Sequence, residues 1–375
     1  MTIKSISTNI GKALLINAFF MFIAIVISVI EGFDSGFTPL AISFSVTFIT
    51  GMFPFIFVKS EPSATLQSGF MTIVLSWLLS FVFGMLPYVL WGGEFTLINA
   101  WFESVSGYTT TGATILTDIE SLPKSILFWR SSTHFIGGLG VIIFLLMVLP
   151  DSSAVKLRLT HLELSSLSKE GYRFRSGTTA RVMVGVYCAL TTCLFLLLWA
   201  AGMSPFDAVN HAFSTVSTGG FSTRNTSIMH YDSVIIDIIL TVFMILSSMH
   251  FGTLFAIAVK RSFKPLGNSV TRYYLSIIAV ISIIIMLSLK LQGGYESWGK
   301  ALLDSTFQTA SYISTTGFGQ ADNALWPLLA NTLLIFAAFH CGCSGSTTGG
   351  IKADRAYISI KAIYGEFQKR LHPNS

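Results

Sequence analysis

Long apolar runs, separated by short polar stretches, make up most of this chain. Eight runs are long enough to cross a bilayer as helices: 13–30, 36–58, 65–91, 127–149, 182–202, 233–259, 273–291 and 324–341. Each run is continuously apolar instead of alternating between apolar and polar residues, which favours helices over the strands of a barrel. The pattern therefore predicts a bundle of membrane-spanning helices.

Three short amphipathic segments lie between pairs of these runs, and each ends in a loop rich in serine, threonine and glycine. The segments include residues 99–106, residues 205–216 and a stretch that begins near residue 298. The loops are Thr109, Thr110, Thr111 and Gly112 (the first loop), Ser217, Thr218, Gly219 and Gly220 (the second loop), and Ser314, Thr315, Thr316 and Gly317 (the third loop). Their last glycines are 108 and 97 residues apart (220 − 112 and 317 − 220). Recurrence at a nearly fixed interval indicates a repeated unit.

The repeat extends beyond the loops. When the three last glycines are aligned, a serine stands six positions earlier in every copy: Ser106, Ser214 and Ser311. Small hydroxyl residues are also common in membrane helices, where they allow close packing. Three occurrences in the same register favour a repeated functional loop over that alternative.

Composition agrees with the hydrophobic pattern. Hydrophobic residues form 52% of the chain, charged residues only 11%, and the mean hydropathy is +0.68. A soluble domain carries about 25% charged residues. The sequence therefore predicts an all-α integral membrane protein built from repeated units of helix, pore helix, filter loop and helix.

The positive charges are divided unequally between the two sides of the expected bundle. Of the 23 lysines and arginines, five fall on the side away from the termini: Lys124, Arg130, Arg224, Lys290 and Lys300. Because positively charged loops stay in the cytoplasm, we expect both termini there, a multi-pass location in the cytoplasmic (inner) membrane, and the three loops near the outer face. The net charge of +5 follows from this topology, and no nucleic-acid-binding motif accompanies it.

Residues that commonly carry catalysis or bind transition metals are scattered along the chain. The cysteines lack the spacing of a zinc site, and the histidines of the hydrophobic regions have no carboxylate at metal-ligand spacing: Cys188, Cys193, Cys341, Cys343, His134, His211, His250 and His340. We interpret them as packing residues and polar contacts inside the bundle. The sequence predicts no enzyme, no transition-metal site and no organic cofactor.

The short segments are better suited to conducting an ion. A short helix that enters from one side must turn back, and a non-helical return segment is tolerated at membrane depth only where it is buried or lines water. Its carbonyl groups can replace an ion's hydration shell, and the C-terminal end of the short helix carries a partial negative charge that favours a cation. The loops contain no acidic residue, so a hard monovalent cation is expected rather than calcium.

A second unusual segment follows His340 near the end of the last apolar run. It contains Gly342, Ser344, Gly345, Ser346, Thr347, Thr348, Gly349 and Gly350, and we call residues 342–350 the glycine-rich segment. So many glycines do not form a stable helix, which predicts a gate or hinge. A phosphate-binding loop lacks its Gly-Lys-Ser/Thr sequence here, and an ordinary helix C-cap needs only one glycine.

These motifs resemble those of the Trk/Ktr/HKT potassium uptake family, most closely the TrkH type. Residues 106–114, 214–222 and 314–318 are similar to that family's first three filters, and residues 341–352 resemble its intramembrane loop below the filter. The resemblance spans essentially the whole chain. It implies a pore-forming subunit that transports K⁺, a homodimer, and a cytosolic nucleotide-binding ring of the TrkA type that gates it.

One part of the family's pattern is not found in these residues. The family has four units around one pore, with a basic residue on the fourth inner helix, whereas this sequence holds three filter loops. Three explanations stay open: a separate chain supplies the fourth unit, copies of the chain associate in an unusual way, or the sequence is a truncated gene product. The alternatives to a potassium uptake pore are a truncated, non-conducting fragment, a sodium-permeable channel or a secondary cation transporter with broken helices. The parallel order of the repeats and the few charges within the runs argue against the transporter.

The repeat also gives the expected division of the chain. Residues 1–63 form a two-helix region, 64–150 the first pore unit, 151–177 a cytoplasmic basic loop, 178–262 the second pore unit, and 263–375 the third unit with a broken inner helix and a cytoplasmic tail. The basic loop has two interpretations, a solvated loop and a docking surface for a cytosolic partner.

Overall fold

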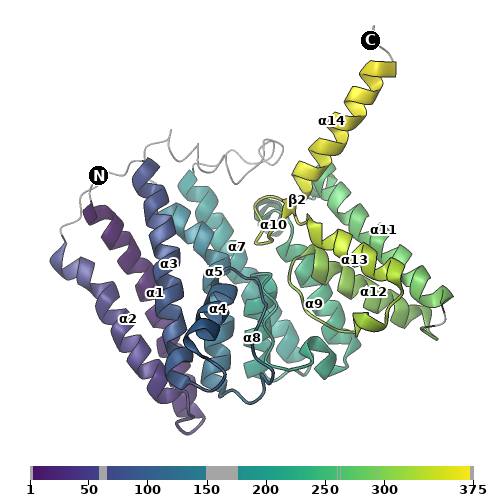
Figure 1. Ribbon diagram of the computed structural model, residues 1–375. Helices are drawn as coiled ribbons and strands as arrows, with labels where there is room; N and C mark the ends of the chain where they lie inside the picture. Colours follow the sequence, from purple (N-terminus) through teal and green to yellow (C-terminus); the bar gives the residue numbers. More distant parts are fainter. Residues whose placement is uncertain are drawn as a thin grey trace.

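The computed structural model describes residues 3–58, 66–148, 176–259, 261, 263–292 and 294–371 and confirms the expected all-α fold (Figure 1). In chain order the helices are α1 (Ile3–Ile30), α2 (Phe37–Phe57), α3 (Leu66–Trp91), α4 (Leu97–Tyr108), α5 (Lys124–Val148), α7 (Ser176–Ala200), α8 (Pro205–Val216), α9 (Val234–Ser247), α10 (Phe251–Ala258), α11 (Ser269–Leu291), α12 (Trp298–Ile313), α13 (Leu328–Phe339) and α14 (Ala353–Leu371). Short 3-10 turns are η2 (Ser227–Tyr231), η3 (Lys264–Gly267) and η4 (Asn323–Leu325).

Five of the helices in the described part are long and apolar enough to cross a membrane: α1, α2, α3, α7 and α11. A sixth span is formed if α9 and α10 are taken together, although they meet at an angle of 111°. The two remaining predicted runs, which correspond to α5 and α13, are not among these long apolar helices. The first half of α5 is rich in polar residues, including Arg130, and α13 has only 12 residues before the backbone leaves the helix.

The N-terminal pair α1 and α2 packs with α3, α4 and α5 around one buried cluster. Met21 and Leu40 from the pair meet Tyr88 of α3, Tyr108 of α4 and Trp129 of α5, and each of these side chains is buried. The glycine at position 11 explains how closely the pair packs, because a Cβ there would lie 2.7 Å from a backbone oxygen of α2. The pair is thus part of the first unit's core.

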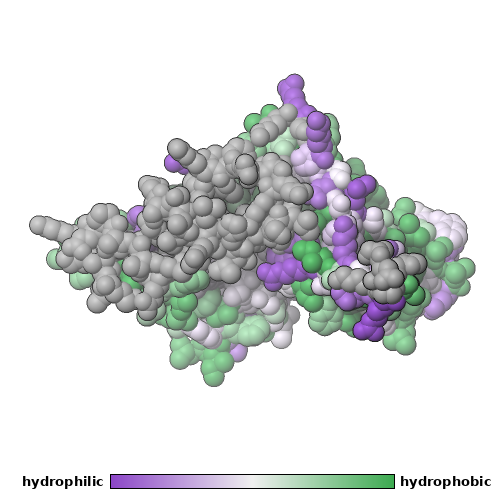
Figure 2. Space-filling view, turned by 90° about the horizontal axis from the view of Figure 1, so that it is seen from above, coloured by the Kyte–Doolittle hydropathy of each residue, from purple (hydrophilic) through white to green (hydrophobic). Residues whose placement is uncertain are grey.

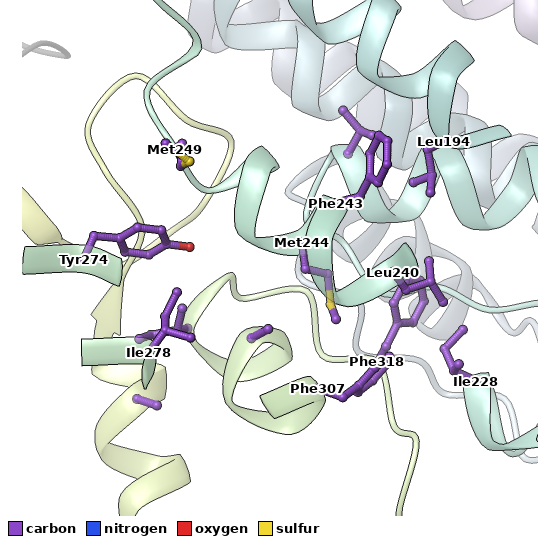
Figure 3. Packing of buried hydrophobic residues seen from close by; sticks show 14 of the residues in the cluster. Leu194, Ile228, Leu240, Phe243, Met244, Met249, Tyr274, Ile278, Phe307 and Phe318 are labelled. Atoms are coloured by element: carbon purple, nitrogen blue, oxygen red, sulfur yellow. The ribbon is translucent and has the colours of Figure 1, made fainter. Parts of the chain in front are cut away.

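The second and third units share a larger buried cluster. Figure 3 shows a central part of it, where Leu240 and Met244 of α9 lie among Phe307 of α12, Phe318 and residues of α11. These apolar side chains fill the space between the inner helix of one unit and the pore helix of the next. The two units therefore form one packed body.

The third inner helix is broken. After α13 the chain forms β1 (His340–Cys341), crosses the glycine-rich segment and returns through β2 (Ile351–Lys352), which pairs in parallel with β1. Helix α14 then leaves the bundle at the end where α1 begins (Figure 1). Seen from that end, hydrophilic side chains of the described residues gather near α14 and toward the middle of the molecule, while apolar ones lie along the sides (Figure 2). The expected basic loop, 151–177, lies outside the described residues except for its last two, which begin α7.

Candidate functional site

Three short helices lead into the three loops, and the sequence defines their starts. The Thr96 side chain accepts a hydrogen bond from Asn99 N at the start of α4, and Ser204 accepts one from Asp207 N at the start of α8, where Pro205 is the first helical residue. α12 begins at Trp298. At 12 to 16 residues these helices are too short to cross a bilayer.

All three loops have the same backbone conformation. The middle threonines have positive φ angles of 52° at Thr110, 58° at Thr218 and 57° at Thr315. The last glycines also have positive φ angles, 76° at Gly112, 83° at Gly220 and 80° at Gly317. Left-handed backbone is unusual for a residue with a side chain, so its recurrence at matched threonines is a specific feature of these loops.

The same hydrogen bonds hold this conformation in each copy. The carbonyl oxygens of the aligned serines accept the backbone N–H five residues later: Thr111 N to Ser106 O at 2.9 Å, Gly219 N to Ser214 O at 2.8 Å and Thr316 N to Ser311 O at 3.0 Å. In the outer two copies the serine hydroxyl also bonds the return segment, Ser106 Oγ to Ala113 O at 2.5 Å and Ser311 Oγ to Phe318 O at 2.8 Å. The aligned serines therefore tie each pore helix to its own loop.

The loops stand side by side in chain order. A Cβ on Gly112 would lie 1.9 Å from Gly219 O, and one on Gly220 would lie 1.9 Å from Thr316 O. We call these contacts the 1–2 seam and the 2–3 seam. A Cβ on Gly317 would have no heavy atom within 4 Å. Within the described part of the chain, the third loop is thus open on the side where the first two each meet a neighbour.

The burial of the loop residues depends on how many neighbouring loops each loop has. In the second loop, which has a neighbour on each side, Ser217 and Thr218 are fully buried. In contrast, Thr109 and Thr111 of the first loop and Gly317 of the third are exposed. The described residues therefore form three adjacent walls with an open side between the third and the first.

The glycine-rich segment lies against the second and third loops on the side from which α14 leaves the bundle. Thr347 Oγ1 donates a hydrogen bond to Val216 O at 3.0 Å, just before the second loop, and Gly349 N donates to Thr315 Oγ1 at 3.2 Å. At its start Cys343 N donates to Ser248 O of the α9–α10 break at 2.8 Å. The segment thus crosses from the second unit to the third, next to the loops and on their α14 side.

The base of this segment is fixed by a buried carboxylate. Asp354 Oδ1, in the first turn of α14, accepts hydrogen bonds from Ser344 N at 3.2 Å and Ser344 Oγ at 2.7 Å. Lys352 Nζ bonds Thr348 O and, at 3.2 Å, Thr348 Oγ1. Both ends of the segment are therefore anchored, and in its middle Gly345 O accepts a hydrogen bond from Phe251 N at 3.2 Å.

Polar residues behind the second loop hold its pore helix. Asp207 accepts hydrogen bonds from Thr223 Oγ1 at 2.6 Å and from Arg224 at 2.8 Å. Burial alone raises the pKa of the Asp207 carboxyl, but the hydrogen bonds from Thr223, Arg224 and Ser204 bring its pKa below the ordinary value. Burial lowers the pKa of His211, which favours the neutral form of its ring. Its Nδ1 lies 2.8 Å from Asp207 O and its Nε2 lies 2.9 Å from Ser222 Oγ.

The sequence did not reveal everything at this site. The pore helices and loops were found from their spacing, and the interpretation of the histidines as polar contacts agrees with His134 against Ser214 at 3.2 Å and His250 capping α10. Arg130 was noticed only as one of five outer-side cations, whereas it forms a buried ion pair with Glu103. Its position within an otherwise apolar run is the signal that could have found it.

Comparison with known proteins identifies the relatives of this arrangement. The family model described as "TrkH: Cation transport protein" matches residues 40–375. The chain belongs to the TrkH cation transport family. The chain is 36% identical over 282 residues to the Trk system potassium uptake protein TrkH of Salmonella typhimurium, covering 75% of this chain and 58% of that relative. It is 35% identical over 283 residues to TrkG of Escherichia coli, covering 75% and 58%.

A solved TrkH structure has the same fold. The crystal structure of the potassium transporter TrkH from Vibrio parahaemolyticus superimposes with a TM-score of 0.87 at 30% identity, covering 100% of this chain and 78% of that chain. The chain spans 58% of the length of its TrkH relative from Salmonella typhimurium. The family is described as one of cation transport proteins, in line with the sequence, which predicted no enzyme.

Proposed function

We propose that this chain forms three walls of a potassium uptake pore in the cytoplasmic membrane, with the ion held by backbone carbonyl groups of the three loops. The observation that carries the proposal is the matched left-handed backbone at Thr110, Thr218 and Thr315, combined with loops that meet edge to edge at the 1–2 and 2–3 seams. The names of the relatives, potassium uptake proteins, support potassium as the ion.

The chemistry of the loops suits a weakly hydrated monovalent cation. Oxygen ligands in a ring replace the hydration shell, and the three pore helices direct their C-terminal ends toward that ring. We assign ion binding to Thr109, Thr110, Thr111, Gly112, Ser217, Thr218, Gly219, Gly220, Ser314, Thr315, Thr316 and Gly317. Several hydroxyls in this set are engaged locally, as between Ser314 and Thr316 at 2.7 Å, and so lock the loops instead of facing the ion.

The glycine-rich segment is the proposed gate. Its hydroxyls and glycines, Gly342, Ser344, Gly345, Ser346, Thr347, Thr348, Gly349 and Gly350, lie below the loops, and Thr347 and Gly349 each make one hydrogen bond to the walls above. Each neutral hydrogen bond that must break for the segment to open costs about 0.5–1.5 kcal/mol. Opening then clears the path that the segment crosses.

The open side between the third and first walls calls for a fourth wall. We propose that a further pore unit, supplied by a separate chain or by another part of a longer chain, occupies it, and that the pore subunit forms a homodimer gated by a cytosolic nucleotide-binding ring of the TrkA type. The exposed Thr111 and Gly317 support the first of these partners. The termini and the basic loop are proposed to lie in the cytoplasm, where the ring would bind.

Growth at low potassium tests the proposal. A bacterium deficient in potassium uptake would express residues 1–375 alone or with a separately encoded fourth unit, and uptake of K⁺ and Na⁺ would be measured in both. We expect potassium-selective rescue only with the fourth unit, and Gly317→Ser should then relax the selectivity because a Cβ disturbs the carbonyl ring. Uptake of Na⁺ in place of K⁺, or no uptake in either case, would contradict the proposal.

A further inference from the structure

A buried ion pair lies behind the 1–2 seam. Glu103 of α4 is 0% exposed and Arg130 of α5 is 1% exposed. Arg130 Nε lies 2.8 Å from Glu103 Oε1, and a terminal guanidinium nitrogen lies 2.7 Å from the same oxygen. Two close contacts from one guanidinium fix the angle between the side chains as well as their distance.

The pair contacts the return segments of two different loops. Glu103 accepts hydrogen bonds from Thr114 Oγ1 at 2.9 Å and from Ile115 N at 3.2 Å, just after the first loop. The Arg130 guanidinium lies 4.2 Å from the centre of the Phe221 ring, which directly follows the second loop. The ion pair therefore joins the first loop to the second.

At the positions that match Glu103 and Arg130, the second and third units have no charged residue. Nine residues before the last loop glycine stand Glu103, His211 and Gln308, and the seventh residue of each inner helix is Arg130, Leu240 or Leu334. Leu240 is completely buried and belongs to the same cluster as Phe318, the counterpart of Phe221 (Figure 3). The second and third units are instead joined by a different polar contact, in which the Gln320 side-chain amide donates to Asp237 of α9 at 3.0 Å and to Asp304 of α12 at 2.9 Å. The Glu103 and Arg130 pair is therefore particular to the 1–2 seam.

The first loop has a neighbouring loop on one side only. The second loop is enclosed on both sides, whereas Thr109 and Thr111 of the first loop are exposed. A loop with packing on one side needs directional contacts to keep its position, and a bidentate guanidinium stacked on an aromatic ring supplies them. A buried ion pair is in general a poor source of stability and a better source of register.

We propose that Glu103 and Arg130 are a positioning pair that sets the placement of the first loop against the second, and through it the selectivity of the pore. The selectivity part rests on the proposed function above. The positioning part concerns this chain alone and can be measured without ion transport.

The variant that tests the pair replaces its two residues with the residues at the matched positions of the third unit. Glu103→Gln with Arg130→Leu reproduces the Gln308 and Leu334 arrangement and leaves no buried charge. Each single substitution strands one buried charge and should give little folded protein, which the second substitution restores. Lys124→Ala is the control, because Lys124 is also on α5 but its ion pair with Glu31 is at the surface. The Lys124 side chain is 50% exposed and the Glu31 side chain 37% exposed.

Hydrogen–deuterium exchange of the purified full chain gives the first readout. We expect faster exchange in residues 107–116 and 219–224 of the double variant, unchanged exchange in residues 311–320, and the wild-type pattern in the control. Unchanged exchange at both loops, or an equal increase over the whole chain, would overturn the positioning role.

Ion uptake in cells that also express a fourth unit gives the second readout. The ratio of K⁺ to Na⁺ uptake should fall by roughly 3- to 30-fold in the double variant, the range over which substitutions remote from a ligand act, with an unchanged amount of protein in the membrane. An unchanged ratio would overturn the selectivity part. A wild-type pairing that transports no K⁺ would contradict the proposed function only, because the exchange measurement still decides the positioning role.

Discussion

A side chain is excluded at Gly220 by two separate effects. The φ angle of 83° is unfavourable for any residue with a Cβ, and the Cβ itself would lie 1.9 Å from Thr316 O. Gly317 has a similar φ angle of 80° but an open space where the neighbour would be. A substitution at either glycine introduces backbone strain, whereas only a substitution at Gly220 also introduces a steric clash at the 2–3 seam.

Gly220→Ala is expected to unfold the loop region at a lower temperature than Gly317→Ala in the chain expressed alone. The second substitution incurs only the strain of left-handed backbone, about 1–2 kcal/mol, whereas the first also separates two walls. Thermal unfolding of the purified variants measures the difference. When a fourth unit is added, the two substitutions should become equally harmful, and a persistent difference would show that nothing occupies the open side.

Asp207 is expected to make the stability of the fold depend on pH. Because its pKa is lower in the folded chain, it stabilises the fold above its unfolded pKa of about 3.9, and this contribution is lost as pH falls through the folded value. Asp207→Asn should be less stable at neutral pH by about 1.5–3 kcal/mol and lose less stability on acidification. Unfolding followed from pH 7 to pH 3 checks this, with the exposed Glu296→Gln as the variant that should match wild type.

The sequence located the loops at residue level because their glycines and hydroxyls recur in register. It could not show that Thr110, Thr218 and Thr315 adopt positive φ angles, since threonine rarely does so and the backbone hydrogen bonds that hold the turns are visible only in the structure. It also could not pair Glu103 with Arg130, because that contact joins a pore helix to an inner helix 27 residues away.

At the scale of elements, caps and breaks were predictable where a residue type marks them. Pro205 marks the start of α8, and the glycines mark the interruption of the third inner helix. The 111° bend between α9 and α10 was not predicted, because Ser247 to His250 contain neither glycine nor proline. That bend is fixed by tertiary contacts, including Ser248 O with Cys343 N.

The glycine-rich segment gives a prediction at this scale. Thr347→Val keeps the shape of the side chain but removes the hydroxyl that donates to Val216 O, so the segment should open more often and K⁺ uptake should become faster. The change expected from one lost hydrogen bond is about 2- to 10-fold. Thr332→Val removes a hydroxyl bonded only within α13 and should leave uptake unchanged, and a slower Thr347→Val variant would contradict the gate.

For the whole molecule, the arrangement of the termini predicts the sidedness of labelling. Ser359 on α14 and Ser121 just before α5 are both exposed. Helix α14 leaves the bundle at the end where α1 begins (Figure 1), whereas the start of α5 contacts the loop after α1, where Ser125 Oγ donates to Asp34 Oδ1 at 2.7 Å. In a chain without its native cysteines, Ser121→Cys should react with a membrane-impermeant maleimide in intact cells. Ser359→Cys should react only after the cells are opened, and the reverse pattern would place the termini outside.

The order of the seams has a consequence for assembly. Each wall contacts the wall that follows it in the chain, so during synthesis each new unit meets a partner that is already present. The open side between the third wall and the first is different, because its two edges lie on the order of two hundred residues apart in the chain and the proposed further unit must meet both of them, and contacts of that separation form slowly. Closing the ring, rather than folding any single wall, is therefore expected to limit the rate at which a working pore appears.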